Sequence, residues 1–214
     1  MFIKHHLCMR PVESFWNREK EIALVAARLR KGGFGYVTGR RRVGKTALLK
    51  RLCRKFGGFY HQAVEGTPEQ QLLHLTDEWS SLLPIFRDVK PRSWLEFFSL
   101  LSGQKLPRLV VFDEFPYWVS ADAALASRFQ KWIDHDLPRL KTLVVVSGSS
   151  QSMLDSHFLK QGAPLYGRAS FHLRLQPMSY QWFCRAMGYR TGDPMSFTRF
   201  ALVGGVPQYW KLMP

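Results

Sequence analysis

A glycine-rich segment between an apolar run and an amphipathic run constrains the fold of this chain more than any other feature. The apolar run 34–38 predicts a strand and the run 45–56 predicts a helix. Between them, GRRRVGKT fits the pattern G-x-x-x-x-G-K-[ST] at Gly39, Gly44, Lys45 and Thr46. In such a loop backbone N–H groups face phosphate oxygens, the lysine reaches the β- and γ-phosphates, and the threonine hydroxyl binds Mg²⁺. The pattern predicts a nucleoside triphosphate site; the alternative is a glycine-rich turn without a ligand.

The variable positions of this loop are unusually basic. They are occupied by Arg40, Arg41, Arg42 and Val43, and Ala47 follows the motif. Variable positions contribute backbone groups, so these five residues are expected to line the nucleotide through their main chain. The arginine side chains are then expected at the rim, where they could raise the local potential, meet a neighbouring subunit or touch nucleic acid. A plain solvated surface is the alternative.

Helix and strand signals alternate along the rest of the chain, which predicts an α/β fold with a parallel sheet. Thr67, with Pro68 and Gln70, predicts a capped helix start. Apolar runs such as 108–114 and 142–148 are typical of parallel strands covered by helices on both faces. Further strands are expected at 59–64 and 169–175, and helices at 17–31, 67–83, 93–102, 124–137 and beyond Ser179.

Two carboxylates stand side by side at the end of the apolar run 108–114. A phosphoryl-transfer site needs one carboxylate near Mg²⁺ and another group to orient or deprotonate the attacking water. We expect Asp113 in the first role. Glu114 is turned to the other side by strand alternation, and we expect it in the second role. An ordinary turn at a strand end is the alternative.

The run 142–148 also ends in polar residues, Ser147 and then Ser149. If this strand lies between the loop strand and the strand of Asp113, these hydroxyls face the γ-phosphate and could position water or sense hydrolysis. A helix N-cap at Ser149 or Ser150 would give the same sequence.

Composition adds a strong positive charge. The 31 Lys and Arg residues against 16 Asp and Glu give a net charge of +15, which favours polyanionic partners or serves only solubility. No apolar run approaches the ~20 residues of a membrane span. The N-terminus has no signal-peptide hydrophobic region, so a cytoplasmic location is expected. The three cysteines have no paired spacing, the histidines form no apparent ligand set, and Trp79, Trp94 and Trp132 are expected in the core.

Six segments in sequence order, FWNREKEI, GRRRVGKTALL, VVFDEFPYW, LVVVSGSSQSML, PLYGRA and FALVGGVPQYW, resemble the archaeal-type ATPases, in the AAA+/STAND branch of P-loop NTPases. The resemblance implies a three-layer sandwich on a five-stranded parallel sheet of order 5-1-4-3-2, followed by a helical lid. ATP and Mg²⁺ are the implied cofactors. It implies adenine contacts from Asn17, Arg18 and Glu19, and nucleotide contacts from the lid at Gly205 and Pro207.

The resemblance also bears on assembly and on the extent of the chain. Arg168 stands where an AAA+ protein presents an arginine to a neighbour's γ-phosphate, which implies an ATP-dependent homo-oligomer; a structural salt bridge is the alternative. We expect an N-terminal extension at 1–16, an ATPase core at 17–176 and the start of a lid at 177–214. Members of the group usually continue well beyond Pro207, so the chain is expected to be shortened.

The sequence thus predicts an Mg²⁺-dependent ATPase with slow turnover that acts as a switch or motor coupled to a partner or nucleic acid. The main alternative is a basic nucleic-acid-binding module whose nucleotide site is vestigial. A small-molecule kinase is a third reading. The pair Asp113 and Glu114 argues against it, because a kinase's acceptor hydroxyl competes with the water that such a glutamate would activate.

Overall fold

The structure is a computed structural model that describes residues 17–149 and 161–213 of the 214-residue chain. The described residues divide into two compact units. Residues 19–176 form the larger unit, and residues 17–18 with 177–213 form the smaller one.

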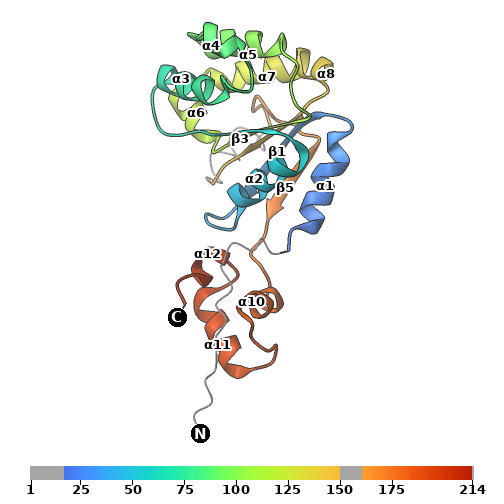
Figure 1. Ribbon diagram of the computed structural model, residues 1–214, viewed down its shortest axis with the longest axis vertical. Helices are drawn as coiled ribbons and strands as arrows, with labels where there is room; N and C mark the ends of the chain where they lie inside the picture. The colour runs from blue at the N-terminus through green and yellow to red at the C-terminus, as the bar shows by residue number, and fades with distance from the viewer. Residues whose placement is uncertain (1–16, 150–160, 214) are drawn as a thin grey trace. The chain divides into compact units, whose positions relative to one another are not determined.

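The larger unit is built on a five-stranded parallel sheet (Figure 1). The strand order is β2-β3-β4-β1-β5, which is the predicted order read from the other edge. The predicted fold class is therefore confirmed. The strands are β1 (Gly33–Gly39), β2 (Phe59–Gln62), β3 (Leu109–Asp113), β4 (Leu143–Ser147) and β5 (Phe171–Leu175).

Helices cover both faces of this sheet, as the apolar strands predict. In Figure 1, α1 (Glu19–Leu29) and α2 (Lys45–Phe56) lie on one side, and α2 contacts β1, β2 and β3. A layer of helices lies on the other side. Its members are α3 (Pro68–Trp79), α4 (Ile85–Asp88), α5 (Trp94–Ser102), α6 (Pro116–Ala121), α7 (Leu125–His135) and α8 (Leu137–Leu140).

The core under this second layer is rich in aromatic side chains. Trp79, Trp94 and Trp132 are buried there, as expected, together with Trp118. Alternate residues of the central strands face them, for example Phe112 of β3, which stacks on Trp79 with ring centroids 5.6 Å apart. Burial of so much aromatic surface fixes this helical layer on the sheet.

Local signals place the ends of several elements. The Thr67 hydroxyl accepts a hydrogen bond from the Gln70 N–H, and the Gln70 side chain accepts one from the Thr67 N–H, so the predicted capping box is confirmed. Helix α2 ends at Gly57, which has a φ of 64°. The short helices α4, α6 and α8 were not expected, because helices of four to six residues leave almost no periodicity to read.

The smaller unit is helical, as expected beyond Ser179. It contains α10 (Tyr180–Met187), α11 (Pro194–Val203) and α12 (Pro207–Trp210) around a small core of Met178, Phe183, Cys184 and Trp210. Close packing against Met178 requires a glycine at position 205. The Gly205 carbonyl accepts a hydrogen bond of 2.7 Å from the Met178 N–H, and a Cβ on Gly205 would lie 2.1 Å from the Met178 carbonyl oxygen.

In the part of the chain that the structure describes, no helix combines the length and the apolar character that a bilayer crossing requires. Cys53 and Cys184 are buried free thiols.

Candidate functional site

Three strands of the larger unit bring predicted site residues to one edge of the sheet. Strands β3, β4 and β1 are neighbours, and all three run parallel. Their carboxyl ends at Asp113, Ser147 and Gly39 therefore lie at the same edge, where parallel α/β sheets bind ligands. The expectation that the strand of Ser147 lies between the other two is confirmed.

The glycine-rich loop connects β1 to α2 and requires its two glycines. Gly39 has a φ of 148° and Gly44 a φ of 101°, a region that side chains with a Cβ rarely adopt. A Cβ on Gly39 would also lie 2.7 Å from the Leu175 carbonyl oxygen. Helix α2 begins at Lys45, so the unpaired N–H groups of its first turn lie at the end of the loop, a favourable place for phosphate.

Lys45 is held inside this loop. Its side chain is buried, and its Nζ donates hydrogen bonds to the carbonyl oxygens of Gly39 (2.9 Å) and Arg40 (3.2 Å). Burial lowers the pKa of Lys45, while the negative charges of Glu114 and Asp113 act in the opposite direction. The Lys45 ammonium is thus hydrogen-bonded to carbonyl oxygens of the loop itself, and phosphate oxygens could take the place of these acceptors.

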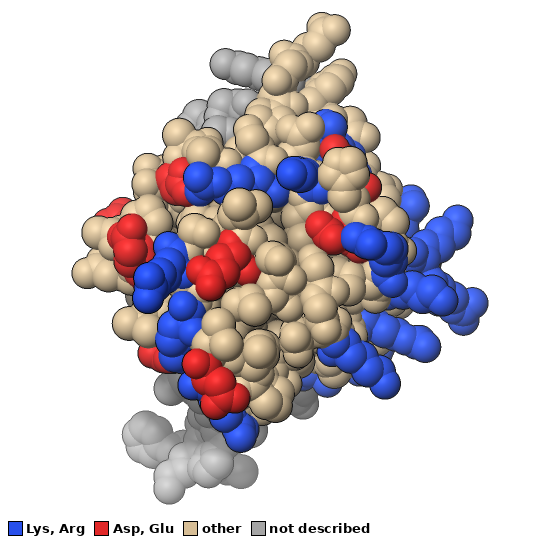
Figure 2. All heavy atoms as spheres, turned by 90° about the horizontal axis from the view of Figure 1, so that it is seen from above, with Lys and Arg blue, Asp and Glu red and all other residues tan. Residues whose placement is uncertain are grey.

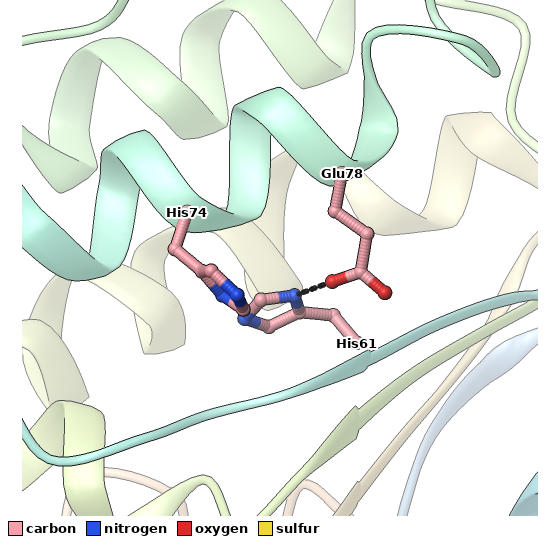
Figure 3. A group of neighbouring side chains, drawn as sticks. All are labelled: His61, His74 and Glu78. Atoms are coloured by element: carbon pink, nitrogen blue, oxygen red, sulfur yellow. Dashed lines mark hydrogen bonds and ion pairs between the residues drawn. The ribbon is translucent and has the colours of Figure 1, made fainter.

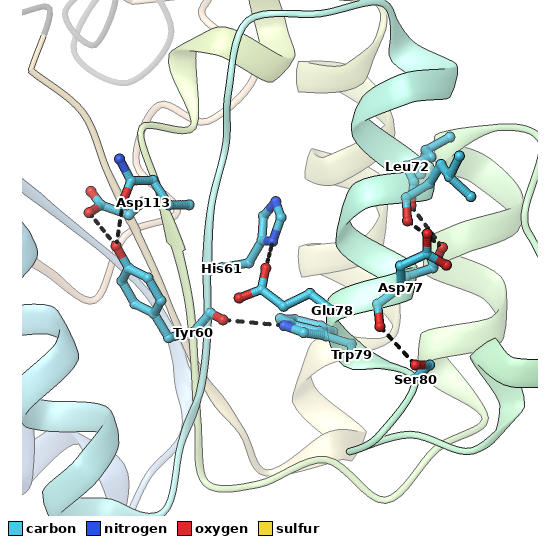
Figure 4. Close-up of polar contacts among 11 residues, drawn as sticks. Tyr60, His61, Leu72, Asp77, Glu78, Trp79, Ser80 and Asp113 are labelled. Carbon is cyan, nitrogen blue, oxygen red and sulfur yellow. Dashed lines mark hydrogen bonds and ion pairs between the residues drawn. The ribbon is translucent and has the colours of Figure 1, made fainter.

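Asp113 is completely buried and accepts hydrogen bonds from four donors. Its Oδ2 accepts from the Thr46 hydroxyl (2.7 Å) and from the Tyr60 hydroxyl (2.9 Å), the latter visible in Figure 4. Its Oδ1 accepts from the Ser147 hydroxyl and from the Glu114 N–H (3.0 Å). Thr46 and Asp113 are the two predicted metal ligands, and they are in direct contact.

Glu114 follows β3 in a strained backbone conformation, with a φ of 54°. The next N–H, that of Phe115, donates to the Ser147 carbonyl oxygen at 2.9 Å and fixes this turn against β4. The Glu114 carboxylate accepts hydrogen bonds from the Ser149 N–H (3.0 Å) and from the Ser149 hydroxyl (2.5 Å). Serines at the end of the neighbouring strand thus hold both carboxylates. Ser147, the last residue of β4, contacts Asp113, and Ser149, two residues further on, contacts Glu114.

Tyr60 is a site residue that the sequence interpretation missed. It lies on β2, and its hydroxyl donates to Asp113. Burial raises the pKa of the Tyr60 phenol, and the charge of Asp113 raises it further, so the phenol keeps its proton. The strand order implied by the family resemblance places β2 beside β3, and therefore places Tyr60 next to the strand of Asp113. That order was the one signal from which the role of Tyr60 could have been predicted.

The remaining predicted residues are placed as follows. Arg40, Arg41 and Arg42 are exposed, Val43 is buried, and Ala47 is exposed in the first turn of α2.

The Arg168 Nε donates to both carboxylate oxygens of Asp134 at 2.9 and 3.0 Å, which is the salt-bridge alternative. Glu19 begins α1, whereas Asn17, Arg18, Gly205 and Pro207 belong to the smaller unit, so their role toward a nucleotide stays a prediction. Ser150 lies outside the described residues.

A parallel sheet of this order, with a glycine-rich loop leading from β1 to α2 and an acidic pair ending β3, defines a P-loop nucleoside triphosphatase fold. The family model described as an ATPase domain predominantly from Archaea matches residues 15–190, and the chain belongs to this family. It is 30% identical over 169 residues to an uncharacterized protein of Methanocaldococcus jannaschii, covering 78% of this chain but only 37% of that protein.

Solved structures agree with this fold. A Walker-type ATPase of Pyrococcus abyssi is 21% identical with a TM-score of 0.68, and the match covers 92% of this chain and 65% of that one. The Orc1 protein of Aeropyrum pernix, solved in complex with DNA, is 16% identical with a TM-score of 0.59, and the match covers 92% and 58%. The chain thus spans less than two thirds of the length of each of these relatives. At these identities the structural likeness shows the fold alone.

Proposed function

We propose that this P-loop ATPase domain binds ATP together with Mg²⁺, hydrolyses it slowly, and serves as a switch or motor coupled to a partner or to nucleic acid. The observation that carries the proposal is the 2.7 Å contact between the Thr46 hydroxyl and Asp113 at the end of the glycine-rich loop. It joins the loop motif and the acidic pair, which are far apart in sequence, into one site.

The donor set suits Mg²⁺. Hydroxyl and carboxylate oxygens are ligands that Mg²⁺ prefers, and neighbouring oxygens around an octahedral Mg²⁺ lie about 3 Å apart. The Thr46 and Asp113 oxygens lie 2.7 Å apart, so both could bind one ion with little movement. When bound there, Mg²⁺ would neutralise charge on the β- and γ-phosphates.

The chain's own groups have separate tasks in this proposal. The backbone of the glycine-rich loop and the first turn of α2 bind the phosphates, and Lys45 exchanges its carbonyl partners for phosphate oxygens. Glu114 accepts the proton of the attacking water. Two hydrogen bonds from Ser149 restrain the Glu114 carboxylate, and they must break before it can accept that proton. Release of Glu114 from Ser149 is therefore the step at which a partner could control turnover.

Single-turnover hydrolysis of ATP with Mg²⁺ tests the role of Glu114. The Glu114→Gln variant is expected to lose at least about 100-fold in hydrolysis rate, since a general base contributes roughly 10²–10⁴. It should still retain ATP. Glu65→Gln, at an exposed position in the loop after β2, is the matched control and should hydrolyse at the wild-type rate. Hydrolysis by Glu114→Gln at the wild-type rate would contradict the assignment.

Nucleic acid is the partner class favoured by the surface charge. Helix α2, directly after the glycine-rich loop, exposes Lys50, Arg51, Arg54 and Lys55. Figure 2 shows Lys and Arg side chains projecting together along one side of the face in view, while Asp and Glu alternate with them elsewhere. If nucleic acid binds this chain, its affinity should fall steeply with salt. If the chain is instead a nucleic-acid-binding module with a vestigial nucleotide site, its affinity for nucleic acid should not change on addition of ATP or in the Lys45→Ala variant.

A further inference from the structure

Three side chains that can bind a metal meet between β2 and α3, although the spacing of the histidines along the chain does not indicate a cluster. One nitrogen of His61, one nitrogen of His74 and one carboxylate oxygen of Glu78 lie within 4.8 Å of one another (Figure 3). His74 and Glu78 are four residues apart on α3, so they share one face of the helix. That face is turned toward His61 of β2.

The cluster has one fixed member and two adjustable members. The His61 side chain is 1% exposed and stacks on Trp118, with ring centroids 5.5 Å apart. The Glu78 side chain is 44% exposed, and His74 is exposed. A metal ion can therefore reach the cluster from solvent on the side of α3, while the buried imidazole anchors it.

We propose that His61, His74 and Glu78 form a binding site for a divalent transition metal of the Zn²⁺ class. Two imidazoles and one carboxylate form a His₂Glu donor set, which holds Zn²⁺ with a water molecule in the fourth position. Oxygen-rich Mg²⁺ sites have a different composition, so the ion of the nucleotide site is a poor competitor here.

Metal binding requires only small movements within the cluster. Ligand atoms in a tetrahedral Zn²⁺ site lie roughly 3.3 Å apart, given bonds of about 2 Å. His61 Nδ1 and Glu78 Oε2 are 2.5 Å apart, so these two atoms would separate slightly as the metal displaces the proton between them. The exposed side chains of His74 and Glu78 can rotate to make these adjustments.

The site would connect two elements that are otherwise joined by few polar contacts that the structure describes. Trp79 of α3 donates a hydrogen bond to the Tyr60 carbonyl oxygen at 3.3 Å, and a metal one residue along the strand would replace the single His61–Glu78 hydrogen bond by a link among three side chains (Figure 4). Tyr60 and His61 are consecutive in β2, so their side chains leave opposite faces of the strand. The metal site is thus separate from the Asp113 carboxylate that Tyr60 contacts.

The test is titration of the untagged full chain with Zn²⁺, and with Co²⁺ followed by visible absorption, in the absence of nucleotide. One equivalent should bind, and binding should persist in excess Mg²⁺. The melting temperature should rise by about 5 °C or more when free Zn²⁺ exceeds its Kd 100-fold. Because no nucleotide is present, failure of this test and failure of the proposed function are distinguishable.

Two exposed substitutions, His74→Ala and Glu78→Gln, separate a metal site from a folding effect. Each should weaken Zn²⁺ binding by at least about 10-fold while the circular dichroism spectrum stays unchanged. His135→Ala, on an exposed residue of α7, is the matched control and should bind like wild type. A second control, the double variant His5→Ala and His6→Ala, measures how much Zn²⁺ these two consecutive histidines bind. Wild-type affinity in both cluster variants, or the absence of saturable binding, would overturn the proposal.

Discussion

The hydrogen bond from Tyr60 to Asp113 offers a quantitative test of the candidate site. Asp113 is fully buried, and its carboxylate depends on four donors. Tyr60→Phe removes one of them and keeps the ring. A hydrogen bond to a charged group contributes about 1.5–3 kcal/mol, so this loss in the free energy of unfolding is expected. For a domain of this size, the melting temperature should fall by roughly 3–12 °C.

Thermal and urea unfolding without nucleotide or Mg²⁺ measure this loss. Tyr117→Phe is the matched control, because that side chain is 38% exposed on α6. It should change the free energy of unfolding by no more than about 0.5 kcal/mol. Equal unfolding midpoints for Tyr60→Phe and wild type would show that the Tyr60 hydroxyl does not support Asp113, and the reasoning on this carboxylate would be wrong.

Three further predictions concern other parts of the larger unit. Ser149→Ala frees Glu114 from one hydrogen bond and should raise basal hydrolysis, by up to about 10-fold if the restraint is rate-limiting; a lower rate would mean that Ser149 positions water instead. Burial raises the pKa of Cys53 to about 12 from its ordinary 9.0, so iodoacetamide at pH 8 should label it far more slowly in the folded than in the unfolded chain. The unfolded chain releases that proton at lower pH, so stability should decline as the pH rises above 9.0, and equal labelling rates would refute the burial. A Cβ on Gly35 would lie 2.1 Å from the Phe171 ring, so Gly35→Ala should cost about 1–3 kcal/mol of unfolding free energy, and an unchanged midpoint in urea would contradict this packing.

The fold was largely predictable because its signals are local. Buried parallel strands leave continuous apolar runs, and all five expected strands are present, with ends that differ by one or two residues. The glycine-rich loop is one contiguous motif, so its backbone requirement could be read from the sequence. The strand order came from the family resemblance and not from the residues themselves, because no local pattern encodes which strands are neighbours.

The parts that the sequence did not reveal depend on pairings between distant segments. Tyr60 reaches Asp113 because β2 pairs with β3, with Tyr60 opposite Val111. His61 lies beside His74 and Glu78 only because α3 folds back over β2, a contact that the sequence analysis of the histidines did not foresee. Sequence spacing relates residues within one element, so it cannot report a cluster shared by a strand and a helix.

The central claim is that the loop from Gly39 to Thr46 binds ATP together with an Mg²⁺ ion held by Thr46 and Asp113. Calorimetric titration of ATP into wild type and Lys45→Ala, each with and without Mg²⁺, tests it most directly. We predict saturable binding of ATP by wild type that is tighter with Mg²⁺, and loss of that binding in Lys45→Ala. Absence of ATP binding at millimolar concentration, or equal affinity of the two proteins, would contradict it.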